Sequence, residues 1–248
     1  MKTSNKLLLG LLILILLTIA TVMVVVKTQF GKLGGPIHKN SGKLATEQRD
    51  LTKFNLLEVE NAIKVNYTQD TFQRVVINAD SSLINLVVSE VRSGKLYLYM
   101  KESVKLHDPI QVDITTDSIN EVKLSAGGIF STTQKMHVSK LNGNGTAGAI
   151  FEVEGDFDEL NLDMTAGCVA NLRGTCNFMD VSCTAGGILN SNDMIAKTAD
   201  VSANAGGIMN VNVTDEISVD VNAGGIIKCS GKAHVKKINV SSGGQFVN

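Results

Sequence analysis

The segment TAGGILNSND (residues 184–193) places two adjacent glycines directly after the strand-like run Val181–Thr184. The same Ala-Gly-Gly-Ile motif recurs in NAGGIMN (204–210) and in NAGGIIK (222–228). Because glycine pairs interrupt a regular strand, a chain that repeats one in the same apolar setting repeats a turn. The Ala-Gly-Gly-Ile motif therefore indicates a structural repeat, and its alanine supplies the register.

The residue before the first glycine of each copy is taken as the anchor of the repeat. Successive anchors lie 18 to 21 residues apart. A nearly constant period of this length is typical of stacked-repeat architectures. The anchors are Ala126, Ala147, Ala166, Ala185, Ala205, Ala223 and Ser242.

Apolar or small residues stand two and four positions before the anchors, as Cys183 and Val181 do, which predicts a strand with one buried face. Three positions after most anchors stands a β-branched residue such as Ile188. This odd step would turn it outward in a regular strand, so we predict that the glycines form a bend or bulge that returns it to the core. The predicted corners, small because the backbone turns and stacks closely there, are Ala126, Gly127, Gly128, Ala185, Gly186, Gly187, Ala205, Gly206, Gly207, Ala223, Gly224 and Gly225.

These patterns predict an all-β fold, a single-stranded β-helix or β-solenoid with coils of about 20 residues. Regular coils are expected over residues 121–248, and less regular coils over 49–120 are expected to continue the stack and cap its start. A β-sandwich is the alternative, because sandwich strands also recur at short intervals. A sandwich, however, does not require the same corner in every copy.

An unbroken apolar stretch covers Leu7–Val26 and is flanked by Lys2, Lys6 and Lys27. Twenty residues of helix span about 30 Å, the thickness of a bilayer core, so we expect one N-terminal transmembrane helix. A cleaved signal peptide is the alternative. The expected organisation is a short head at 1–6, the anchor at 7–26, a flexible stalk at 27–48 and a solenoid domain at 49–248 outside the cytoplasm.

Three segments carry a family resemblance: TEQRDLTKFNLLEVENAIKVNYTQD (46–70), VRSGKLYLYMKE (91–102) and PIQVDITTDSINEVKLSAGGIF (109–130). Their opening strand, glycine turn and small-residue corner resemble the bacterial family of auto-transporter adhesin head domains, the GIN domain. The resemblance covers about residues 46–248. It implies an exported β-helical domain and brings no catalytic residues.

Composition narrows the function classes. The chain has 23 Lys and Arg against 24 Asp and Glu, and outside the N-terminal region it has no basic cluster that would neutralise a nucleic-acid backbone, so nucleic acid is not an expected partner. The four cysteines, Cys168, Cys176, Cys183 and Cys229, form no CxxC pair and lie far from the histidines. We therefore expect no metal and no cofactor. Cys183 falls in the inward column, while Cys176–Cys183 is the nearest plausible disulfide loop.

Two outward columns form the candidate ligand-facing surface: Asn161, Asp180 and Asp200 in one, Asp163 and Asp220 in the other. Stacked carboxylates and amides can bind sugar hydroxyls or calcium, yet a solvated sheet face also needs polar residues. Catalysis is disfavoured, because these residues belong to repeating columns rather than to a singular cluster. We expect a non-enzymatic binding or adhesion module of the cell envelope, with glycan or an envelope protein as partner.

The last coil, residues 238–247, shows no obvious cap, and an uncapped edge invites pairing. A scaffold that forms homo-oligomers through its solenoid ends is therefore the alternative function, and a polysaccharide-active enzyme is a remote one.

Overall fold

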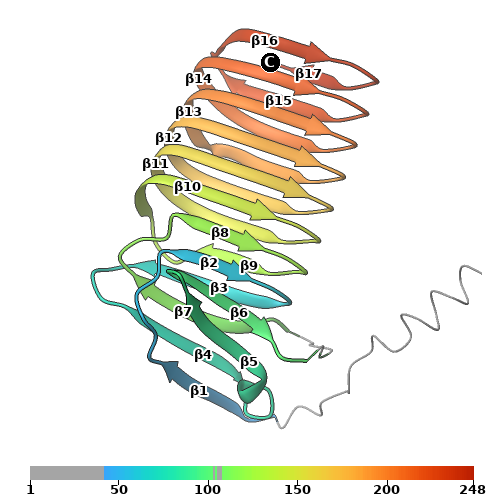
Figure 1. Ribbon diagram of the computed structural model, residues 1–248. Helices are drawn as coiled ribbons and strands as arrows, with labels where there is room; N and C mark the ends of the chain where they lie inside the picture. Colours follow the sequence, from blue (N-terminus) through green and yellow to red (C-terminus); the bar gives the residue numbers. More distant parts are fainter. Residues whose placement is uncertain (1–41, 103, 105–107) are drawn as a thin grey trace, which may run out of the picture. The chain divides into compact units, whose positions relative to one another are not determined.

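The computed structural model describes residues 42–102, 104 and 108–248, and all of its strands join one sheet that winds on itself (Figure 1). The predicted transmembrane helix at residues 7–26 lies outside the described residues. Within the described residues, none of the helical structure has the length and apolarity needed to cross a bilayer. The elements are β1 (Leu44–Arg49), β2 (Leu56–Val59), β3 (Ile63–Gln69), β4 (Arg74–Asp80), the 3-10 turn η1 (Ile84–Leu86), β5 (Val87–Arg92), β6 (Lys95–Met100), β7 (Ile110–Thr116), β8 (Glu121–Leu124), β9 (Ile129–Thr132), β10 (Met136–Gly145), β11 (Ile150–Thr165), β12 (Val169–Thr184), β13 (Ile188–Asn204), β14 (Ile208–Val221), β15 (Ile226–Gly231), β16 (His234–Val240) and β17 (Gln245–Val247).

The repeat region is a β-solenoid, as the period predicts. Strands β10 to β14 pair in sequence order, each parallel to the next. Leu162 pairs with Val181, and Val181 pairs with Val201, so each residue stacks on its counterpart one coil away. This parallel pairing at an offset of one coil rules out the sandwich alternative.

The inward columns form a continuous core. Met164, Cys183, Ala203 and Val221 follow one another through the stack, and each is at most 1% exposed. Where β10 carries glycines on its inward face, the ring of Phe151 fills the space, and a Cβ on Gly145 would lie 2.9 Å from it. Small and large inward residues thus compensate each other across neighbouring coils.

Each corner is a two-residue turn of type I′, which needs a left-handed φ at both central residues. In the turn after β12, Ala185 has φ +52° and Gly186 has φ +79°. The amide of Gly187 closes this turn by donating to the carbonyl of Thr184 (3.4 Å). The φ of every anchor lies between +47° and +55°, so seven non-glycine residues hold a conformation that L-residues rarely adopt.

The reason for small residues at the corner differs from the one predicted. The anchor alanines and the first glycines, such as Ala205 and Gly206, are exposed and do not pack closely. The close approach occurs at the second glycine, where a Cβ on Gly207 would lie 2.4 Å from the carbonyl oxygen of Cys183 and one on Gly225 would lie 2.3 Å from that of Ala203. A larger side chain would therefore overpack the corner at the second glycine and not at the anchor alanine.

The prediction that the residue three after the anchor faces the core is wrong. Ile208 at this position is 37% exposed, whereas Met209, the next residue, is fully buried. A two-residue turn leaves the alternation of a strand in phase, so the even positions on both sides of it face inward. The β-branched residues form a half-buried outer row instead.

The first part of the domain continues the stack, but its coils are not in sequence order. Strand β2 pairs with both β6 and β8, and β3 pairs with both β7 and β9, all parallel. The β2–β3 coil, first in the sequence, therefore lies between the β6–β7 and β8–β9 coils (Figure 1). Beyond β7, β4 and β1 add antiparallel strands, and β5 pairs antiparallel with β6. Strand β1 begins at Leu44, inside the range predicted as stalk.

Candidate binding surface

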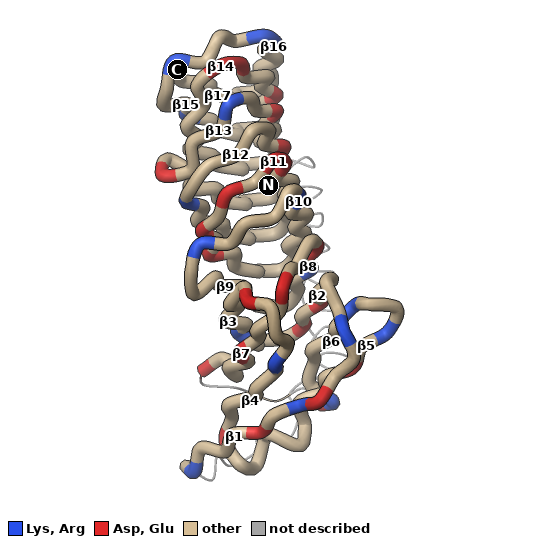
Figure 2. Tube along the Cα trace, turned by 90° about the vertical axis from the view of Figure 1, so that its left-hand side faces the viewer, with Lys and Arg blue, Asp and Glu red and all other residues tan. Residues whose placement is uncertain are grey.

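The two predicted polar columns lie side by side on the solvent face of β11 to β14. Asn161, Asp180 and Asp200 occupy one column and pair in register. Asp163 and Asp220 lie in the neighbouring column, which also holds the serines of β12 and β13. Figure 2 shows acidic positions recurring along one side of the stack. We use the name acidic face for the five residues of the two columns, Asn161, Asp163, Asp180, Asp200 and Asp220.

Burial and neighbouring carboxylates both disfavour the charged form of Asp180 at the centre of the acidic face. Partial burial raises the pKa of Asp180, and the carboxylates of Asp200 and Asp163 raise it further. A shallow hollow of about 250 Å³ lies along Asp180, Asp200 and Asp220, with Lys237 beside it. Across the described part of the chain, however, no group of three or more His, Cys, Asp or Glu side chains is arranged to hold a metal ion. Within the acidic face, Asp180 and Asp200 are the two carboxylates that pair directly across neighbouring coils.

The cysteines line the core. All four are buried and unpaired, so the Cys176–Cys183 disulfide considered above is absent from the structure. Burial raises the pKa of the thiols of Cys176 and Cys183 to about 12 each. A thiol with such a pKa stays protonated at neutral pH and is a poor nucleophile.

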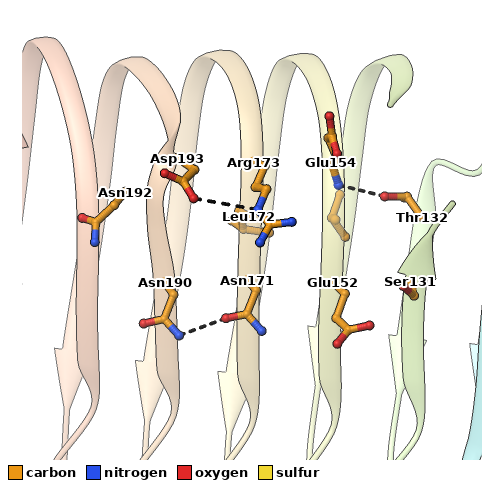
Figure 3. A pocket seen from close by; sticks show the side chains of 11 residues that line it. Ser131, Thr132, Glu152, Glu154, Asn171, Leu172, Arg173, Asn190, Asn192 and Asp193 are labelled. Atoms are coloured by element: carbon orange, nitrogen blue, oxygen red, sulfur yellow. Dashed lines mark hydrogen bonds and ion pairs between the residues drawn. The ribbon is translucent and has the colours of Figure 1, made fainter. Parts of the chain in front are cut away.

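A second polar surface, which sequence reasoning missed, forms a groove of about 420 Å³ across β11, β12 and β13 (Figure 3). Its side chains stand in two rows, separated by inward residues such as Leu172. We call this site the amide groove and define it by Glu152, Asn171 and Asn190 in one row and by Glu154, Arg173 and Asp193 in the other.

Asparagines form a hydrogen-bonded ladder that begins on one wall of the amide groove, at Asn171 and Asn190, and continues to Asn210 on the next coil. The Nδ2 of Asn190 donates to the Oδ1 of Asn171 (3.0 Å), and the Nδ2 of Asn210 donates to the Oδ1 of Asn190 (3.3 Å). At the first rung, Glu152 forms an ion pair with Lys64, whose Nζ lies 3.4 Å from the carboxylate. The row therefore runs from a neutralised carboxylate through three amides.

A β-bulge shapes the other wall. Asn171 pairs with Asn190 but Arg173 pairs with Asp193, so β13 carries one extra residue here. Ser191, buried inside the bulge, donates to the carbonyl of Asn210 (2.9 Å). The extra residue places Asp193 opposite Arg173, where the Nε and Oδ2 atoms lie 3.8 Å apart. Bulges commonly re-aim side chains at the edges of functional sites.

The asparagines recur at intervals of 19 and 20 residues, so a signal for this ladder was present in the sequence. The expectation that the residue three positions after the anchor faces the core placed these asparagines inside the solenoid, so the sequence did not predict an outer row. An inward Ile188 would also turn Asn190 inward, whereas the type I′ turn places both on the outer face.

The family described as "Putative auto-transporter adhesin, head GIN domain" matches residues 53–246, and the chain belongs to this family. The match covers the stack from β2 to β16 and confirms the resemblance noted in the sequence. No curated protein matches the chain.

Solved structures share the fold at low sequence identity. A protein from Bacteroides fragilis titled a putative adhesin has a TM-score of 0.74 at 20% identity, covering 84% of this chain and 98% of its own. A second, from Parabacteroides merdae and titled a putative adhesin, has a TM-score of 0.69 at 18% identity, covering 85% and 99%. A third, from Parabacteroides distasonis and titled a putative lipid binding protein, has a TM-score of 0.63 at 16% identity, covering 86% and 100%. These names are those of adhesins and of a binding protein rather than of enzymes.

Proposed function

We propose that this chain is a non-catalytic, adhesion-type module that binds a hydroxyl-rich ligand, such as a glycan, through the amide groove. The observation that carries the proposal is the asparagine ladder, whose rungs Asn171 and Asn190 stand on paired strands at the wall of a concave polar site and which Asn210 continues on the next coil. Side chains fixed by such a framework lose little conformational entropy when a ligand binds, which favours affinity.

The location of the module is part of the same proposal. Membership of an adhesin head family supports an extracytoplasmic domain. The apolar stretch Leu7–Val26 would hold it on the membrane as a single-pass anchor. The polar lining of the amide groove favours hydroxyl groups over acyl chains, so a sugar suits this site better than the tail of a lipid.

The test is a glycan array probed with the full-length chain in mild detergent. We expect selective retention on a subset of glycans, and the binding should persist when calcium is removed with a chelator, because amides rather than clustered carboxylates line the groove. A wild-type chain that is folded by circular dichroism and binds no glycan on a broad array contradicts the proposal.

The last coil supports a second candidate function, an envelope scaffold. Strand β16 pairs only with β14, and β17 pairs only with β15, within the described residues. Residues that continue the core columns are exposed there, with Ile238 at 54% and Val240 at 43%. An apolar edge with unpaired backbone groups favours strand addition by a partner.

Analytical ultracentrifugation distinguishes this scaffold from a monomeric binding module. A self-associating scaffold gives concentration-dependent oligomers that Ile238→Lys abolishes, while the exposed Ile195→Lys, on the side of the stack, leaves them intact. A wild-type chain that stays monomeric at every concentration removes self-association from consideration.

A further inference from the structure

We infer that the amide groove selects an uncharged polyhydroxyl chain, a neutral saccharide that lies along the stack across successive coils, and disfavours anionic saccharides. This inference rests on the proposed function and adds the charge and the orientation of the ligand. It is carried by the hydrogen-bonding capacity of the ladder, by the charges around it and by the direction in which its rungs are spaced.

The free hydrogen-bonding capacity of the ladder matches hydroxyl groups. A side-chain amide carries two N–H donors and two acceptor lone pairs. Asn190, at the centre, gives one N–H to Asn171 and accepts one hydrogen bond from Asn210. One donor and one acceptor of Asn190 remain for a ligand. A hydroxyl group both donates and accepts, whereas a carboxylate or sulfate only accepts and would leave the amide oxygens unmatched.

The charges around the ladder also favour a neutral ligand over an anionic one. The amide groove contains the carboxylates of Glu152, Glu154 and Asp193, against the cations of Arg173 and of Lys64, which is bound to Glu152. Three negative groups against two positive ones leave the site slightly acidic. An anionic ligand would meet net repulsion, while a neutral ligand avoids both the repulsion and the desolvation of its own charge.

The spacing of the rungs sets the orientation. Asn171, Asn190 and Asn210 belong to three successive coils, and parallel strands lie about 4.8 Å apart. A saccharide that runs across the strands, parallel to the stack, meets one rung per coil. The bulge at Ser191 keeps Asp193 opposite Arg173, so the second wall follows the same direction. Affinity should therefore rise with chain length until a ligand spans the three rungs.

Calorimetric titration of the full-length chain tests these points directly. The probes are oligosaccharides of one to six glucose units and of one to six mannose units, together with oligogalacturonates of the same lengths as the anionic counterparts. We expect binding of a neutral series that tightens with length, and weak or no binding of the oligogalacturonates.

Variants locate the site. Asn190→Asp removes the donors of the central rung and adds a charge, and we expect it to weaken binding at least about tenfold, the loss of one or two hydrogen bonds. The matched control is Asn177→Asp, an exposed asparagine that makes a similar inter-coil hydrogen bond to Asp158 (2.9 Å) outside the amide groove. It should bind like wild type. Asn190→Leu provides a second variant without an added charge, and unchanged thermal melting shows that each variant is folded.

The outcomes distinguish a failure of this inference from a failure of the proposed glycan-binding function. Neutral chains that bind and lose affinity in both Asn190 variants support the inference. Oligogalacturonates that bind as tightly as the neutral chains overturn the charge selection, and neutral binding that ignores both Asn190 variants overturns the site, while either result leaves a glycan-binding function standing. Failure of the glycan array as a whole contradicts the proposed function itself.

Discussion

At the scale of the residue, the conformation of the anchor alanine is the most unusual feature of this chain. Ala185 adopts φ +52°, and its carbonyl accepts a hydrogen bond from Gly167 of the preceding coil (3.2 Å). The left-handed conformation costs an L-residue about 1–2 kcal/mol relative to the right-handed one. The same hydrogen bond from a glycine of the preceding corner reaches the carbonyls of Ala147, Ala166, Ala223 and Ser242, and it helps to hold these anchors in their conformation against that cost.

Asn tolerates the left-handed region better than Ala, so Ala185→Asn should raise the free energy of unfolding by about 0.5–1 kcal/mol. The Ala185 side chain is exposed, so a larger polar side chain can extend into solvent. Urea denaturation measures the effect. The control Ala203→Asn, at a fully buried inward position, should destabilise the chain strongly. An Ala185→Asn chain less stable than wild type contradicts this account of the corner.

The raised pKa of Asp180 makes a prediction about pH. The folded state holds the proton of Asp180 more tightly than the unfolded chain, so stability falls as pH rises from the ordinary carboxyl range through the raised pKa. Asp180→Asn removes this penalty. We expect the variant to melt at a higher temperature than wild type near pH 7 and at the same temperature near pH 3, where the carboxyl is protonated in both states. Equal melting temperatures at both pH values would show that the acidic face is fully screened by solvent.

At the scale of the element, the residue two positions after each anchor, which is glycine in most corners, sets how closely two coils approach. A Cβ on Gly207 would lie 2.4 Å from the carbonyl oxygen of Cys183, whereas one on Gly187 would lie 3.3 Å from that of Met164. Two other corners carry Ala149 and Cys168 at this position, both fully buried. The corner thus accepts a small side chain only where the preceding coil leaves room.

Gly207→Ala should therefore destabilise the chain by about 1–3 kcal/mol, the usual cost of overpacking. Gly187→Ala, the same substitution at the equivalent position one coil earlier, should cost clearly less. The two free energies of unfolding, measured by chemical denaturation, form a matched pair. Equal losses at the two positions would mean that the spacing between coils is not set at this glycine.

At the scale of the whole molecule, the order in which the coils stack decides which of them resist local opening. The β2–β3 coil has neighbours on both sides, although it comes first in the sequence. Among the described residues the last coil has a neighbour on one side only, and its core-column residues Ile238 and Val240 are exposed. Local opening in stacked folds begins where fewest contacts must be broken.

Amide hydrogen exchange should therefore be slowest in β12 and β13, slow in β2 and β3, and fastest in β16 and β17. Mass spectrometry of peptides after deuterium labelling measures this order. Exchange in β2 as fast as in β17 would contradict the position of the first coil within the stack.

Local sequence determined the architecture of the repeat region. Alternation around the anchors and the period of the corners depend only on neighbouring residues, so they predicted the solenoid, the inward position of Cys183 and the side-by-side placement of Asp180 and Asp200. The tertiary structure decided three features that depend on backbone dihedrals and on partners distant in sequence.

First, the type I′ turn kept the strands in phase and turned Ile188 outward. Second, the same phase, together with the bulge at Ser191, assembled the amide groove. Third, pairing between β2 and β8 set the order of the coils in the first segment. A parallel ladder binds any strand of matching pattern, so the order of coils follows from long-range packing and cannot be read from the residues of one strand.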